Sequence, residues 1–164
     1  MGFFFAALVA GLLATGVMVV ALYLPVLWGG LHYDTLGGLG AMVLRRVDAR
    51  ARVVGAVLLA LGGVAFALFY GWFVQMFLFG PFPAPQYLLF AVPQLNLFFP
   101  IFGFVAGFCH GIFIGIITTF VVVDYHPVPS YREVFPLLVS FIVGHTVYGV
   151  VVTSFLSLFL RLVG

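Results

Sequence analysis

The sequence predicts an all-α membrane protein, with four transmembrane helices in an up-down bundle and a short interfacial helix between the first two. Of its 164 residues, 65% are hydrophobic and 6% are charged, whereas soluble proteins carry about 25% charged residues. The mean hydropathy is +1.33. Four apolar runs also reach the roughly 20 helical residues that a bilayer core requires. They cover residues 3–28, 53–79, 98–123 and 134–160, and we expect them to form a single domain over residues 1–164.

The first run, residues 3–28, is longer than the apolar core of a signal peptide, so we expect it to be a retained span. After it, Asp34 is a candidate N-cap for a short helix over about residues 35–44, which has apolar residues on one side. That pattern is typical of a helix lying on the membrane surface. An arginine-rich run follows, and we expect its side chains to attract anionic lipid headgroups. Its members are Arg45, Arg46, Arg50 and Arg52.

The distribution of arginine predicts the orientation in the membrane. The connections at 29–52 and 124–133 carry arginine, while the connection at 80–97 carries no charge. We therefore place both arginine-bearing connections in the cytoplasm and both termini outside, in a bacterial inner membrane. Prolines recur in the uncharged connection, so we expect an irregular segment with at most a turn or two of helix near 87–91. Because it is apolar, it should lie against the outer leaflet or beneath a neighbouring protein.

A four-residue repeat of glycine marks the third run. Its members are Gly103, Gly107, Gly111 and Gly115. Such a repeat leaves one face of a helix stripped to backbone, and Thr118 continues that face. A second line of mostly small residues follows the fourth run through His145, Gly149, Thr153 and Ser157. We expect both lines to serve close packing between helices.

His110 and His145 are the ionisable residues deepest within the spans, and they lie at nearly the same depth on consecutive helices. Ionisable groups within a membrane are functional candidates. We expect these histidines to be hydrogen-bonded to neighbouring groups for structure, with no bound cofactor. The alternatives are a tetrapyrrole site, in which both imidazoles bind a haem b iron axially or a single histidine ligates the magnesium of a chlorophyll, or a proton path. If the third and fourth spans touch along Gly107 and Gly111, no slot for a macrocycle remains between them.

Other residues indicate little chemistry. The single cysteine, Cys109, provides no disulfide, and we expect it to be a small buried core residue. His32 and His126 lie in the connections, where we expect them at the surface. The sequence carries no motif for a catalytic or metal site, and a net charge of +2 gives no indication of a nucleic-acid partner.

The segments HGIFIG and GHTVYG resemble parts of a group of small bacterial four-span membrane proteins. In that group a Gly-His-x-x-Tyr-Gly element recurs near the end of the chain, and His145, Tyr148 and Gly149 match it. The resemblance implies a four-span fold. It implies no catalytic or binding residues, because the group has no assigned function.

We expect a non-catalytic accessory subunit of a larger membrane complex, in respiratory or photosynthetic electron transport. The small-residue faces exceed what four helices need internally, which indicates contacts with other transmembrane subunits or self-association as well as with lipids. One alternative is a haem b or chlorophyll subunit that uses His110, His145 or both. Another is a small transporter or channel. No soluble substrate is indicated.

Overall fold

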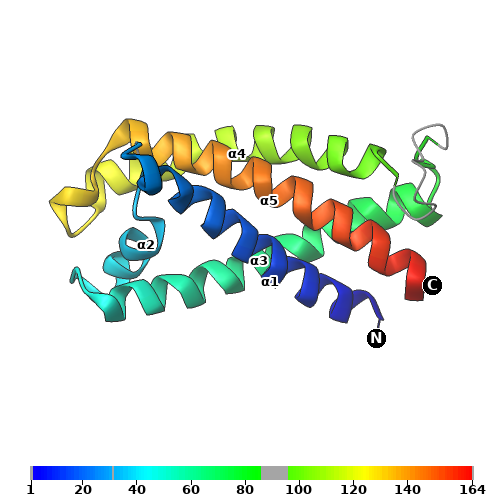
Figure 1. Cartoon of the computed structure of the whole chain (residues 1–164), viewed down its shortest axis with the longest axis horizontal. Coiled ribbons are helices and arrows are strands. Elements are labelled where there is room, and N and C mark those ends of the chain that lie inside the picture. Colours follow the sequence, from blue (N-terminus) through cyan, green and yellow to red (C-terminus); the bar gives the residue numbers. More distant parts are fainter. Residues whose placement is uncertain (1, 31, 86–95, 164) are drawn as a thin grey trace.

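The computed structural model describes residues 2–30, 32–85 and 96–163, and these residues form helices and connections without a β-strand (Figure 1). Four long helices are each apolar and long enough to cross a membrane, which confirms that part of the predicted fold class. They are α1 (Gly2–Tyr23), α3 (Ala49–Phe79), α4 (Phe98–Tyr125) and α5 (Val134–Val163). The turn of helix expected near 87–91 lies outside the described residues.

Three shorter elements lie in the connections. The helix α2 (Thr35–Leu44) occupies the range that the sequence predicts, while η1 (Leu24–Trp28) and η3 (Pro129–Tyr131) are 3₁₀ turns. Two aspartates cap helices. The carboxylate of Asp34 accepts a hydrogen bond from the Gly37 N–H at 3.0 Å, and that of Asp48 accepts one from the Ala51 N–H at 3.0 Å. Each carboxylate occupies the positive end of a helix dipole, so these boundaries follow directly from local sequence.

The backbones of α4 and α5 meet along the glycine repeat of α4. A Cβ atom built on Gly107 would lie 3.0 Å from the Cα of Thr146, and one built on Gly111 would lie 2.8 Å from the Cα of Ile142. Both distances are shorter than ordinary van der Waals contact, so only glycine fits at these positions. The Thr153 hydroxyl donates a hydrogen bond of 2.7 Å to the Phe99 carbonyl across the same contact. The groove on α4 is therefore filled by α5 of the same chain.

Glycine also brings α1 against α3, where a Cβ atom on Gly11 would lie 2.9 Å from the Cα of Val64. By contrast, the main contacts between α3 and α4 are made by aromatic side chains. The rings of Phe77 and Phe98 are 4.8 Å apart, and those of Phe77 and Phe102 are 5.0 Å apart. Ring pairs hold two helices farther apart than glycines do. In Figure 1, α3 diverges from α4 and α5 towards the end of the bundle where α2 lies.

Both arginine-bearing connections lie at one end of the bundle, and the N-terminus and C-terminus lie at the other (Figure 1). This is the grouping that the predicted orientation requires. The side of the membrane that each end faces stays a prediction, as does the position of α2 at a membrane surface.

Two expectations about single residues are wrong. Cys109 is exposed rather than buried. Gly107 and Gly111, two residues before and after it, lie on the face of α4 that contacts α5, so Cys109 points away from that face. His126 has no exposed surface, because its connection folds back onto α2. His32 is exposed, as expected.

Candidate functional site

A cavity of about 240 Å³ occupies the half of the bundle where α3 diverges from α4 and α5. All five α-helices contribute to its lining, which is mostly Leu, Met, Ile, Val and Phe side chains with a few glycines. The polar side chains of the lining are Tyr33, Thr35, Thr118, Ser140, His145 and Tyr148. An apolar cavity with a few polar groups is the usual form of a binding site for a small molecule.

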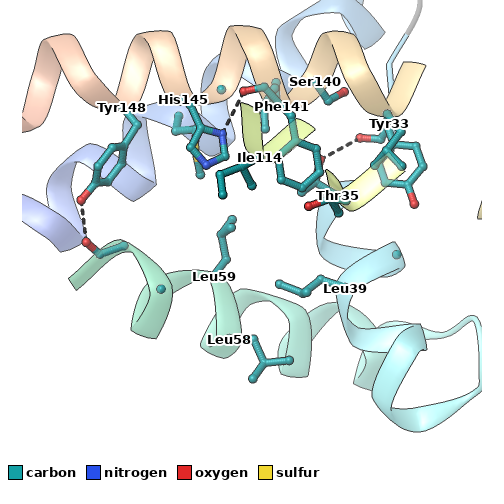
Figure 2. Close-up of a pocket in the computed structure, with 18 of the residues that line it drawn as sticks. Tyr33, Thr35, Leu39, Leu58, Leu59, Ile114, Ser140, Phe141, His145 and Tyr148 are labelled. Atoms are coloured by element: carbon teal, nitrogen blue, oxygen red, sulfur yellow. Dashed lines mark hydrogen bonds between the residues drawn. The ribbon is translucent and has the colours of Figure 1, made fainter. Parts of the chain in front are cut away.

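His145 supplies one of the polar groups from α5. Figure 2 shows its ring directed from α5 towards Leu59 of α3, into the cavity. The Nδ1 atom lies 2.9 Å from the backbone carbonyl oxygen of Phe141. A carbonyl only accepts hydrogen bonds, so Nδ1 carries the proton and donates. In the neutral ring Nε2 is then a bare acceptor. It has no hydrogen-bond partner among the described residues.

His110 lies beside His145, as their similar depth predicts, and the two ring centroids are 4.8 Å apart. The Nδ1 atom of His110 is 3.4 Å from the hydroxyl of Tyr70. The ring of Phe66 packs edge-on against both imidazoles, at 4.5 Å from His110 and 6.2 Å from His145. Of the two histidines, only His145 lines the cavity.

This packing bears on the tetrapyrrole hypothesis. Because α4 and α5 touch along Gly107 and Gly111, a macrocycle does not fit between them. A haem held between these two helices by both histidines is therefore excluded in this structure. Ligation of a tetrapyrrole by one histidine from another direction stays a prediction. Within the part of the chain that the structure describes, no group of three or more His, Cys, Asp or Glu side chains is arranged to hold a metal ion.

Several polar groups of the cavity are already engaged within the protein. The Tyr148 hydroxyl donates to the Gly63 carbonyl at 2.5 Å, as Figure 2 shows, and the Tyr33 hydroxyl donates to the Tyr131 carbonyl at 3.2 Å. The hydroxyls of Thr118 and Ser140 form no hydrogen bond with any of the described residues. The cavity can thus offer His145 Nε2 and two hydroxyls to a bound molecule.

The cavity reaches the side of the bundle. Met42 of α2 and Leu58 of α3 both line it, and each is 36% exposed. The wall of the cavity beside α2 and α3 therefore includes side chains that also reach the surface of the bundle. Gly62 of α3 also lines the cavity, and a Cβ atom built on it would have no heavy atom within 4 Å.

A polar cluster around Asp34 joins the helix ends at the arginine-rich end of the bundle. The Asp34 carboxylate accepts hydrogen bonds from the Tyr23 hydroxyl at 2.5 Å and from the Arg52 Nε at 3.1 Å, in addition to its bond to Gly37. Burial raises the pKa of Asp34, and the hydrogen bonds from Tyr23, Gly37 and Arg52 lower it. The lowering is larger than the raising, so the pKa lies below its usual range. The cluster holds α1, α2 and α3 together beside the cavity.

His126 joins α2 to the connection between α4 and α5. Its Nε2 lies 3.0 Å from the Gly38 carbonyl oxygen, and its Nδ1 accepts a hydrogen bond of 3.1 Å from the Val128 N–H. Arg132 donates two bonds to the His126 carbonyl, at 2.9 and 2.7 Å. These bonds hold α2 in the position where it lines the cavity.

The arginines expected to bind headgroups differ in their surroundings. Arg52 pairs with Asp34 and Arg46 pairs with Asp48. Neither Arg45 nor Arg50 forms an ion pair among the described residues. Binding of lipid headgroups by all four stays a prediction.

No protein-family model, curated protein or solved structure matches the chain. Sequence reasoning identified His145 as a candidate but did not predict the cavity or the roles of Ser140 and Gly62 in it. Hydroxyl residues deep in the spans were the available signal, and that signal does not say which of them share one space.

Proposed function

We propose that this protein binds an apolar molecule that enters its cavity from the bilayer, and that it does so without catalysing a reaction. The cavity between the five helices supports this proposal, because its lining is apolar and its wall includes Met42 and Leu58, which also reach the surface of the bundle. Such a site excludes water and accepts molecules already dissolved in lipid. The Tyr148 hydroxyl and the Nδ1–H of His145 are bonded to backbone carbonyls, so neither of these protons is available to a bound molecule.

Assembly into a larger complex has weaker support than the sequence indicates. The expectation depended on a surplus of small-residue faces, yet the glycines of α4 contact α5, and Gly11 contacts α3. Accessory-subunit function in electron transport thus stays a prediction. A subunit inventory after purification in mild detergent tests it. A lone monomer would contradict it.

The transporter or channel hypothesis needs a continuous polar path past His110 and Thr118. The predominantly apolar lining beside Thr118 favours an apolar ligand over ions or water. Charged solutes are costly to place in such surroundings.

A hydrocarbon probe tests the proposal. We expect radiolabelled limonene to bind saturably to the protein in nanodiscs, above the level in empty nanodiscs. Gly62→Leu should abolish this binding, because the new side chain enters the cavity without meeting backbone. Gly16→Leu is the matched control, since Gly16 also has no heavy atom within 4 Å of a built Cβ but does not line the cavity. Equal binding by wild type and Gly62→Leu would overturn the proposal.

A further inference from the structure

We infer that the bound molecule carries a hydroxyl group, which donates a hydrogen bond to Nε2 of His145. This inference rests on the proposed function, because it names the chemical class of the ligand for the same cavity. The class comprises apolar molecules with an O–H group, such as an isoprenoid alcohol or a hydroquinone.

The tautomer of His145 determines the polarity of this contact. Its Nδ1 donates to the Phe141 carbonyl over 2.9 Å, one helical turn earlier on α5, and this bond is independent of any ligand. Nε2 is consequently left with a lone pair and no proton. A ketone, ether or ester presents only acceptors to it, whereas an alcohol or a phenol presents a donor.

Groups of the protein near His145 do not supply that donor. The Tyr148 hydroxyl is bonded to Gly63, and the Nδ1 of His110 faces the Tyr70 hydroxyl. Although the two imidazole centroids are only 4.8 Å apart, the rings are inclined at 69° and form no hydrogen bond with each other. A polar atom without a hydrogen-bond partner is costly in apolar surroundings. A donor on the ligand removes this cost, so the hydrogen bond contributes favourably to the free energy of binding.

The shape of the cavity indicates how the molecule lies. Figure 2 places His145 nearer one end of the lining, with Ser140, Thr35 and Tyr33 towards the other end. The hydroxyl would bind at His145, and the apolar body would extend along α5 towards α2. The cavity volume of about 240 Å³ lies just below the roughly 300–1,000 Å³ of most small-molecule sites, so the bound molecule should be small. A molecule of about ten carbons suits a cavity of this size.

Two ligands with the same geranyl group test the inference. In nanodiscs, we expect geraniol to bind wild-type protein about three- to tenfold more tightly than geranyl methyl ether, after correction for partition into empty nanodiscs. The two probes share the geranyl group, and the ether has a methyl group in place of the O–H proton, which removes the donor. In His145→Phe this preference should disappear while limonene still binds. Nitrogen NMR of labelled histidine adds a direct readout, because geraniol should shift the Nε2 resonance of His145.

Two control variants separate His145 from its neighbours. His110→Phe removes the other imidazole and Cys109→Ala changes the residue before it, and neither of these residues lines the cavity. Both should keep the preference for geraniol. Loss of the preference in either, or equal binding of geraniol and its ether by wild type, would overturn the inference. If limonene binds but the preference is missing, only the hydroxyl inference fails. If no ten-carbon probe binds, the proposed function fails with it.

Discussion

Replacing Gly111 by alanine tests the contact between α4 and α5, on which the exclusion of a macrocycle depends. The new Cβ atom would lie 2.8 Å from both the Cα of Ile142 and the carbonyl oxygen of Phe141. These are backbone atoms and cannot rotate away. To reach ordinary contact at about 3.4 Å, the helices must separate by roughly 0.6 Å. A gap of this size forfeits about a quarter of the dispersion energy of the atom pairs beside it.

We expect Gly111→Ala to lower the free energy of unfolding by about 1–3 kcal/mol, the usual range for overpacking a close contact. Unfolding by sodium dodecyl sulfate from mixed micelles, followed by circular dichroism, measures this change. Gly62→Ala is the control, because a Cβ atom there meets no heavy atom within 4 Å. If Gly111→Ala and Gly62→Ala were equally stable, α4 and α5 would not touch as described, and a macrocycle between them would again be possible.

Three further predictions concern the Asp34 cluster and the histidines. Asp34→Asn should lower the free energy of unfolding by about 1–2 kcal/mol, because it weakens the charge-assisted bonds from Tyr23 and Arg52 while keeping a capping side chain. Unfolding by sodium dodecyl sulfate should show a smaller loss for the control variant Asp48→Asn. Because folding lowers the pKa of Asp34, its stabilising contribution is complete above the unfolded value of about 3.9 and is lost as the pH falls through the folded value. The midpoint temperature of thermal denaturation should therefore fall as the pH is lowered below about 4, and it should fall less steeply in Asp34→Asn. Parallel curves for wild type and Asp34→Asn would contradict this assignment. The visible spectrum of the purified protein should lack the band of a bis-histidine haem, because α4 and α5 leave no room for a macrocycle between them. A Soret band that is present in wild type and absent from each of His110→Phe and His145→Phe would refute this.

Much of the fold is predictable because its causes are local. A run of about 20 apolar residues is long enough to cross a bilayer wherever it occurs, so the four long helices can be identified one at a time. The N-cap at Asp34 depends on residues within one helical turn, and α2 begins immediately after it. The proximity of His110 and His145 also follows from counting residues along two helices joined by a short connection.

The sequence alone determined that one face of α4 is stripped to backbone, but the tertiary structure decided that α5 of the same chain covers it. Periodicity defines a face and carries no information about its partner. The same limit explains Cys109 and His126, whose burial depends on segments distant in the chain. The cavity was decided only by the tertiary structure, since it is the space left at the end of the bundle where α2 lies and α3 diverges from α4 and α5. Such a space depends on the positions of many side chains together, and no short stretch of sequence encodes it.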